Sequence, residues 1–149
     1  SVCILDESKK RELHKKNLKF SYRSVNISKA TPAISCVIRL KKDAKEGVIS
    51  RVRKILDYRN STQPHSLPSA GCIFKNPQKI SAGRLIDDLG LKGVRVRGAM
   101  ISEKHANFIV NIGNATAKDV ITLMELVKDK VKEERNLFLE PEIVILGEE

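Results

Sequence analysis

Aromatic residues and long hydrophobic runs are scarce in this chain. Trp is absent, and Phe and Tyr together make up 4% of the 149 residues. The longest apolar runs reach about six to eight residues, well short of the roughly 20 that a helix needs to cross a bilayer. The sequence therefore indicates no membrane-spanning segment, and it lacks the aromatic surface on which single-stranded nucleic acids usually stack.

Cysteine is also rare, and its spacing excludes several kinds of site. Cys3, Cys36 and Cys72 are an odd number, and no two of them form a C-x-x-C pair, so neither a zinc site nor a redox dithiol is indicated. A P-loop, a G-x-G-x-x-G turn before a helix and a metal-spaced His/Cys cluster are absent, so we expect no metal. The start of the chain is unlike a secretory signal peptide, and we expect a reducing, cytoplasmic setting.

Positive charge is plentiful by contrast. The chain has 28 Lys and Arg against 18 Asp and Glu, a formal net charge of +10. A basic surface attracts nucleic acids, acidic membranes or small molecules that carry phosphate. The shortage of aromatic side chains favours a small phosphorylated ligand, although many of the lysines can serve only to solvate helices and turns.

Strands and helices alternate loosely along the chain, which is typical of the α+β class. Apolar residues at helical spacing predict helices from about 42–46 to 60, from 82 to 89 and from 117 to 135. Thr116 predicts the N-cap of the last helix, and Gly90 the C-terminal end of the middle one. Apolar and β-branched runs predict strands at 2–5, 20–25, 33–40, 71–75, 94–101, 106–112 and 143–146, of which 33–40 is expected to be buried.

Residues 68–77 read PSAGCIFKNP and carry the first chemical candidate. Cys72 follows Gly71, a residue type that lets the backbone approach a ligand closely. A thiol with an ordinary pKa of about 8.5 is protonated at neutral pH and can donate a proton. A free cysteine is more often a small buried hydrophobe, so both roles stay open for Cys72 at this point. Lys75 and Asn76, just behind it, can position an anionic ligand.

Three further places combine polar and apolar residues. Arg23, next to Tyr22, offers a planar fork of donors for a carboxylate or phosphate, or forms a surface ion pair. Glu142 stands between Pro141 and an apolar run, where enclosure would raise the pKa of its carboxyl group and exposure would leave it inert. His105 is either a ligand contact or an ordinary surface histidine.

PSAGCIFKNP resembles the PSxGSxFKNP signature of the UDP-N-acetylenolpyruvoylglucosamine reductase (MurB) family, flavoenzymes of peptidoglycan synthesis. Other segments resemble the family's motifs in the same order: FSYRS its FxYRxS, YRNSTQP its RRxxxQP, SAGRLID its AGxLI, SEKHANFIVNIGNATAKDV its SxKHAxFIVNxGxATxxDV, and LEPEIVILG its LEPEVRIIG. Together these ordered matches, over 20–147, identify the chain as similar to the C-terminal half of such an enzyme. The short link 77–81 resembles the family's compact type.

The resemblance implies a division into the tail of an FAD-binding domain, residues 1–60, and a substrate-binding domain, residues 61–149. It implies a reaction in which NADPH reduces FAD and the flavin reduces the enolpyruvyl double bond of the UDP-sugar, giving UDP-N-acetylmuramate. The family's N-terminal domain, which supplies most contacts to the phosphates and adenine of FAD, has no counterpart here. We therefore expect a chain that holds FAD poorly and is inactive alone. The expected partners are the UDP-sugar, NADPH and the N-terminal domain, with no nucleic acid, no membrane and a monomeric state.

By motif position, the family's catalytic Arg, Glu and Ser fall on Arg23, Glu142 and Cys72. Hydride addition leaves an enolate-like charge that donors must stabilise and an acid must then protonate. Cys72 departs from the usual Ser, and because a thiol is the stronger acid, we predict that it is the proton donor. Activity should then fall at alkaline pH and on oxidation.

The resemblance also implies a set of substrate contacts. Asn76 matches a family residue near the diphosphate, and Lys75 adjoins it. Arg84 and His105 are further substrate candidates, and Tyr22 is expected beside the flavin or the substrate. Leu67 stands where relatives often carry Tyr, so a contact from that position is not expected.

Two readings from other classes compete with the reductase. The same cations would serve a non-catalytic basic module that binds nucleotide-sugars or nucleic acid. Cys72 would alternatively be the nucleophile of a cysteine hydrolase, although no His partner is evident from the spacing.

Overall fold

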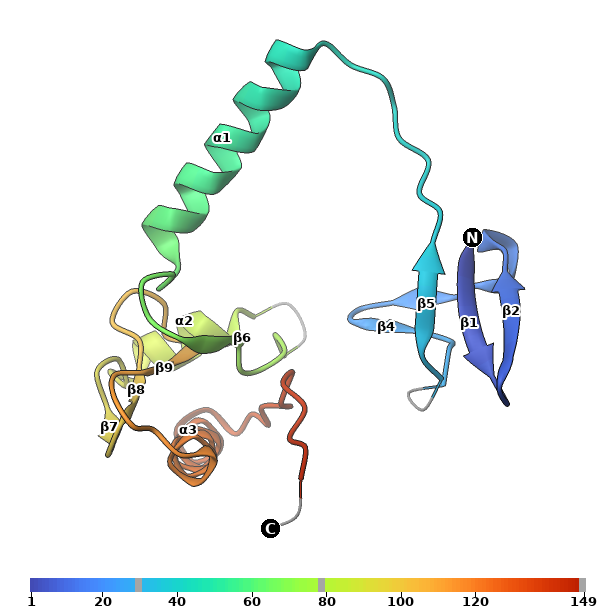
Figure 1. Ribbon diagram of the computed structural model, residues 1–149. Helices are drawn as coiled ribbons and strands as arrows, with labels where there is room; N and C mark the ends of the chain where they lie inside the picture. Colours follow the sequence, from blue (N-terminus) through green and yellow to red (C-terminus); the bar gives the residue numbers. More distant parts are fainter. Residues whose placement is uncertain (29–30, 78–79, 148–149) are drawn as a thin grey trace. The chain divides into compact units, whose positions relative to one another are not determined.

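A computed structural model describes residues 1–28, 31–77 and 80–147, and these residues form two compact units (Figure 1). Unit 1 is Ser1–Gly47 and unit 2 is Val48–Glu149. Both helices and antiparallel sheets are present, so the predicted α+β class is confirmed. The assignment of 1–60 and 61–149 to flavin and substrate binding stays a prediction, and the predicted compact link 77–81 includes 78–79, which lie outside the described residues.

Unit 1 is built on a three-stranded antiparallel sheet in the order β2-β1-β5. Strands β1 (Val2–Asp6) and β2 (Lys9–Leu13) form a hairpin whose two turn residues, Glu7 and Ser8, both have positive φ, which suits the right-handed twist of paired strands. Strand β5 (Ala33–Cys36) pairs with the other edge of β1. A 3-10 helix, η1 (Lys15–Asn17), precedes a small second hairpin of β3 (Phe20–Ser21) and β4 (Ser24–Val25).

Helix α1 (Lys45–Thr62) forms over the predicted apolar stripe. The stripe residues Val48, Val52, Ile55 and Leu56 are all exposed, and no residue of α1 is buried. Its last turn is closed by the hydroxyl groups of Ser61 and Thr62, which both donate to the carbonyl of Tyr58 at 2.8 Å.

The sheet of unit 2 is four-stranded, antiparallel and ordered β6-β9-β8-β7. The strands are β6 (Ser69–Cys72), β7 (Arg95–Val96), β8 (Ala99–Ile101) and β9 (Phe108–Asn111). Cys72 pairs with Phe108, and an irregularity interrupts the register between Ser69 and Cys72. This places Cys72 at the end of an edge strand.

Two helices complete unit 2, and α3 (Ala117–Arg135) packs against β7 and β8 and touches α2 (Ala82–Asp88) (Figure 1). Thr116 and Asp119 form a reciprocal capping box at the start of α3, and hydrogen bonds from Thr116 lower the pKa of the Asp119 carboxyl group. The core joins the helices to the sheet through buried apolar side chains, among them Phe74, Leu85, Ile86, Ile101, Leu123, Met124, Val127 and Val131.

Several strand predictions are wrong in part. Residues 20–25 are two short strands with a turn between them, and only 71–72 of the run 71–75 and 108–111 of the run 106–112 lie in strands. Residues 94–101 are two strands, because Arg97, with φ of 49°, turns the chain between them. Only 33–36 of the run 33–40 is a strand, and it is exposed, since Ile4 is the one buried residue among those described in unit 1. Residues 143–146 form no strand; instead an isolated bridge joins Phe74 and Pro141. The three helices are confirmed within one to two residues of their predicted ends.

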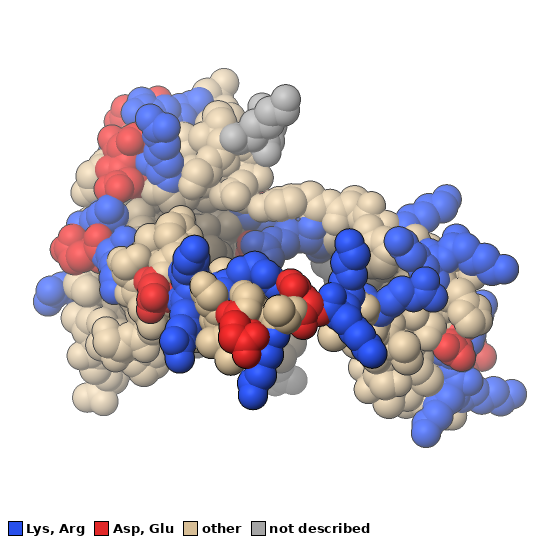
Figure 2. Space-filling view, turned by 90° about the horizontal axis from the view of Figure 1, so that it is seen from above, with Lys and Arg blue, Asp and Glu red and all other residues tan. Residues whose placement is uncertain are grey.

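Among the described residues, no helix combines the length and the apolar character that a membrane span requires. On the face seen in Figure 2, Lys and Arg side chains are spread over the surface with Asp and Glu among them. They do not gather in a single stripe on that face.

Candidate active site

Two of the three predicted catalytic residues lie on neighbouring backbone segments of unit 2. Beyond β6, the backbone of Ile73, Phe74 and Lys75 runs antiparallel to 140–142. The N–H of Glu142 donates to the carbonyl of Ile73 at 2.7 Å, and the N–H of Lys75 donates to the carbonyl of Glu140 at 2.9 Å. Glu142 is thus bonded to the residue that follows Cys72, and both side chains are half-buried. The pairing brings together residues that are far apart in the sequence.

Gly71 shapes the approach to Cys72. Its φ is +85°, a conformation that strains any residue with a Cβ, and an added Cβ there would meet nothing within 4 Å. The backbone beside the thiol is therefore turned sharply and left open on that side. Cys72 is not in a disulfide.

Arg23 and Tyr22 lie in unit 1, at the turn of the β3–β4 hairpin. Arg23 has φ of 56°, and its guanidinium carbon lies 5.8 Å from the centre of the Tyr22 ring, within the range of a cation–π contact. Both side chains are exposed. Their approach to Cys72 and Glu142, which belong to unit 2, stays a prediction.

Lys75 and Asn76 already have partners within unit 2. The Lys75 ammonium forms an ion pair with the Glu140 carboxylate. This pair joins the signature segment, residues 68–77, to the C-terminal segment, residues 140–142. Asn76 Oδ1 accepts a hydrogen bond from the N–H of Ala82 at 3.0 Å and so helps to begin α2. Both residues therefore shape the site, and their predicted contact with substrate is untested.

Arg84 and His105, the remaining predicted residues, line one small cavity of about 250 Å³ in unit 2. We call it the basic pocket, because three cations surround it. Its lining consists of Ser81, Gly83, Arg84, Asp87, Lys92, Lys104, His105 and Ala106. Lys92 and Lys104 were not singled out from the sequence, where they look like ordinary surface lysines.

The cations of the basic pocket are only partly neutralised. Lys92 Nζ pairs with Asp87 at 2.7 Å and Arg84 Nε with Asp88 at 3.7 Å, whereas Lys104 Nζ donates to the carbonyl of Asn60. Burial lowers the pKa of His105, and the nearby charge of Lys92 lowers it further, so the imidazole is neutral at pH 7. A neutral histidine among cations can donate one hydrogen bond to an anion that the cations attract.

His105 is held by its neighbours. Its Nδ1 accepts a hydrogen bond from the N–H of Asn107 at 3.2 Å, and its ring meets Phe108 edge-on at 4.9 Å. Because Nδ1 is an acceptor, the ring proton of the neutral form is assigned to Nε2. Gly83 leaves room for the ring, since a Cβ there would lie 3.0 Å from His105 Cε1.

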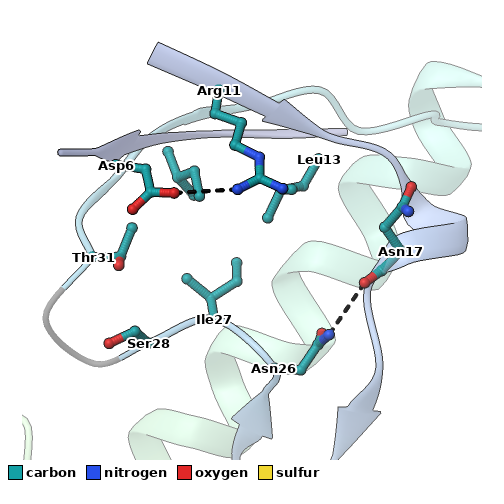
Figure 3. A pocket seen from close by; sticks show the side chains of 9 residues that line it. Asp6, Arg11, Leu13, Asn17, Asn26, Ile27, Ser28 and Thr31 are labelled. Atoms are coloured by element: carbon teal, nitrogen blue, oxygen red, sulfur yellow. Dashed lines mark hydrogen bonds and ion pairs between the residues drawn. The ribbon is translucent and has the colours of Figure 1, made fainter. Parts of the chain in front are cut away.

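A larger cavity of about 410 Å³ lies in unit 1 and was not predicted (Figure 3). Asp6 and Arg11, from the two strands of the first hairpin, point toward each other across it and pair at 3.2 Å. Asn26 closes another side by donating to the carbonyl of Asn17 at 3.2 Å. These residues form no motif; the β1–β2 hairpin brings Asp6 and Arg11 together, and Asn17 and Asn26 lie outside the strands. In the part of the chain that the structure describes, no three His, Cys, Asp or Glu side chains are grouped as metal ligands.

Comparison with known proteins agrees with the motifs. Residues 63–146 match the family described as UDP-N-acetylenolpyruvoylglucosamine reductase, C-terminal domain. A UDP-N-acetylenolpyruvoylglucosamine reductase of Bacillus pumilus is 42% identical over 139 residues, covering 92% of this chain and 46% of the relative. One from Bacillus licheniformis is 41% identical over 138 residues, covering 91% of this chain and 75% of that sequence.

A solved structure is similar as well. The crystal structure of UDP-N-acetylenolpyruvylglucosamine reductase (MurB) from Thermus caldophilus has a TM-score of 0.80 and 38% identity, over 94% of this chain and 50% of that protein. The chain thus spans about half the length of the Bacillus pumilus and Thermus caldophilus proteins. The ordered motifs, the matching C-terminal domain and these identities show that the chain belongs to the UDP-N-acetylenolpyruvoylglucosamine reductase family.

Proposed function

We propose that this chain is the C-terminal part of a cytoplasmic enzyme that reduces UDP-N-acetylenolpyruvoylglucosamine to UDP-N-acetylmuramate with NADPH, for peptidoglycan synthesis. Residues 1–60 would belong to its FAD-binding domain and 61–149 would bind the substrate. The observation that supports the proposal is the hydrogen bond from the N–H of Glu142 to the carbonyl of Ile73 at 2.7 Å, because it joins one proposed catalytic residue to the residue that follows another in a chain of this family.

Each proposed catalytic residue has a distinct task. The Arg23 guanidinium stabilises negative charge that develops on the substrate's carboxylate as hydride arrives. The Sγ–H of Cys72 then gives its proton to the adjacent carbon, and the resulting thiolate recovers a proton from solvent. Glu142, fixed beside the strand end that bears Cys72, takes part in this proton transfer through its carboxyl group.

FAD would supply hydride transfer to the substrate after its reduction by NADPH. The exposed ring of Tyr22 beside Arg23 fits the flat, polar ring end of such a group, since it offers an aromatic face next to a cation. The part of the relatives that this chain does not span would hold the rest of FAD.

The basic pocket is the proposed site of the substrate's diphosphate. Arg84, Lys92 and Lys104 attract a strongly anionic group, and the Nε2–H of His105 donates to one of its oxygens. Asn76 and Lys75 would border this site from the signature segment.

The proposed reaction is tested on a reductase assembled from this chain and the N-terminal half of the Bacillus pumilus relative. We expect FAD-dependent NADPH oxidation that requires the UDP-sugar, and none from this chain alone. Replacing Cys72 by Ala should lower the rate by about 10²- to 10⁴-fold, because the proton donor is lost. Cys72→Ser should keep activity and should remove the decline at alkaline pH. Near-normal turnover by the Ala variant would remove Cys72 from the mechanism.

Binding by the 149-residue chain separates this function from a module that binds nucleic acid. We expect UDP-N-acetylmuramate to bind and Arg84→Met to weaken it, with weak binding of duplex DNA. Tight DNA binding that falls steeply between two salt concentrations, without affinity for the UDP-sugar, would favour the module instead.

A further inference from the structure

Asn107 is a buried polar residue whose side chain forms two hydrogen bonds with the backbone of Phe74. The N–H of Phe74 donates to Asn107 Oδ1 at 3.0 Å, and Asn107 Nδ2 donates to the carbonyl of Phe74 at 2.8 Å. The N–H of Ile73 donates to the backbone carbonyl of Asn107 at 2.9 Å. Asn107 therefore continues the pairing of β6 with β9 past the point where Cys72 meets Phe108. Its side-chain amide forms the two hydrogen bonds with Phe74 that the backbone of a neighbouring strand would otherwise form.

The segment Ile73–Phe74, which is hydrogen-bonded to Asn107 on one edge, is hydrogen-bonded to Glu142 on its other edge. Phe74 bridges Pro141, and the N–H of Glu142 donates to the carbonyl of Ile73. Ile73 and Phe74 thus lie between Asn107 on one side and residues 140–142 on the other, and they are bonded to both. A shift of Ile73 and Phe74 would move the backbone of Cys72 and of Glu142 together.

The backbone of the same residue contacts the histidine of the basic pocket. The backbone N–H of Asn107 donates to His105 Nδ1 at 3.2 Å and so leaves the proton on Nε2. Asn107 itself is only 3% exposed and does not line the basic pocket. It reaches both groups of candidate site residues without access to a ligand.

We propose that Asn107 is a positioning residue whose side chain fixes the backbone segment that follows Cys72 and that is hydrogen-bonded to Glu142. It acts through the N–H and the carbonyl of Phe74. A leucine of similar volume would fill the core but would leave the N–H and carbonyl of Phe74 buried and without these partners. The inference rests on the proposed function only for its effect on turnover.

The first test measures the geometry in the 149-residue chain, without any activity. The chain is labelled with a maleimide, and mass spectrometry gives the labelling rate of Cys72 relative to the exposed Cys36. Asn107→Leu should change this ratio at least several-fold, because the strand end that bears Cys72 is released. Long-range ¹H–¹⁵N NMR of the His105 ring should keep its Nε2–H form, because the leucine variant retains the backbone N–H that donates to Nδ1.

Asn107→Asp is the second variant, for the case in which the Leu variant does not fold. It should restore the two hydrogen bonds to Phe74 only when its carboxyl group is protonated. Once protonated, the carboxyl group can accept from the N–H of Phe74 and donate to its carbonyl, as the amide does, whereas the carboxylate cannot donate. The Cys72 labelling ratio should therefore match the parent chain at low pH and depart from it at high pH, with the parent measured at each pH.

Asn111→Leu is the matched control. Asn111 is the last residue of β9, and its Oδ1 accepts from the N–H groups of Gly113 and Ala115 at 2.9 and 3.2 Å. Its loss removes one exposed and one half-buried hydrogen bond but touches neither Phe74 nor His105. We expect lowered stability with an unchanged Cys72 ratio and His105 spectrum.

In the assembled reductase, Asn107→Leu should lower kcat by roughly 10- to 100-fold, since a misplacement of about 1 Å can have that effect. An inactive parent enzyme would refute the proposed function but leave the labelling and NMR results standing. Unchanged labelling of Cys72 in both Asn107 variants, or an equal change in Asn111→Leu, would overturn the positioning role.

Discussion

Replacement of Gly83 by Ala should disturb the basic pocket through a single methyl group. Gly83 is buried in α2, and a Cβ built on it would lie 3.0 Å from His105 Cε1 and 3.5 Å from Asn107 Cβ. The first distance is tighter than almost all real contacts of a Cβ atom, so the imidazole must move by a few tenths of an ångström. Its hydrogen bond to Asn107 and its contact with Phe108 both resist that movement.

Two effects on the free energy of unfolding oppose each other. Alanine is favoured over glycine within a helix by up to about 1 kcal/mol. Overpacking of a buried site lowers stability by typically about 1–3 kcal/mol. We therefore expect Gly83→Ala to lower the free energy of unfolding by roughly 0–2 kcal/mol, as the difference of these two terms. Urea unfolding of the 149-residue chain measures this change.

Gly90→Ala is the matched control at the other end of α2. Gly90 has φ of +67°, and a Cβ there would meet nothing within 4 Å. Its substitution should lower stability by about 1–2 kcal/mol through backbone strain alone. The NMR signals of the His105 ring and the affinity for UDP-N-acetylmuramate should change in the Gly83 variant and stay constant in the control. A Gly83→Ala chain that is more stable by about 1 kcal/mol, with an unaltered His105 spectrum, would refute the packing described here.

Three further predictions concern the stability of unit 2. Thr116→Ala removes the N-cap of α3 and should lower the free energy of unfolding by about 0.5–2 kcal/mol, whereas Thr116→Ser should restore most of it in urea unfolding. Leu123→Ala empties a fully buried site, so a loss of about 2–5 kcal/mol is expected by the same assay, and a loss under 1 kcal/mol would contradict its burial. The pKa of His105 is lowered by folding, so the unfolded chain takes up the proton first as the pH falls. Stability should therefore decrease below about pH 6.5, and this part of the pH dependence should disappear in His105→Gln.

The helices could be predicted because their signals are local. Thr116 and Asp119 stand three residues apart and bond to each other's backbone, so the start of α3 is encoded within four residues. Gly90 likewise ends α2 without help from distant segments. Such features do not depend on which strand or helix packs nearby.

The strand errors arise where the outcome depends on distant segments or on one unusual dihedral angle. Residues 94–101 are apolar and β-branched enough to read as one strand, and only the positive φ of Arg97 divides them. The runs 33–40 and 143–146 are apolar, and an apolar run is usually buried against another segment. The sequence of the run does not say which segment that is. Ile34 and Val144 remain 48% and 79% exposed, respectively.

The candidate site was likewise predictable only where the signal is local in the sequence. Composition and spacing drew attention to Cys72 but could not choose between a core thiol and a catalytic one, and only the resemblance linked it to Glu142. The structure adds the physical link, which runs through Ile73 and Phe74. Asn107 went unnoticed because its role exists only when those two residues lie beside it. An asparagine next to a strand is ordinary in a sequence; with both amide atoms bound to one backbone residue, it decides where that strand can lie.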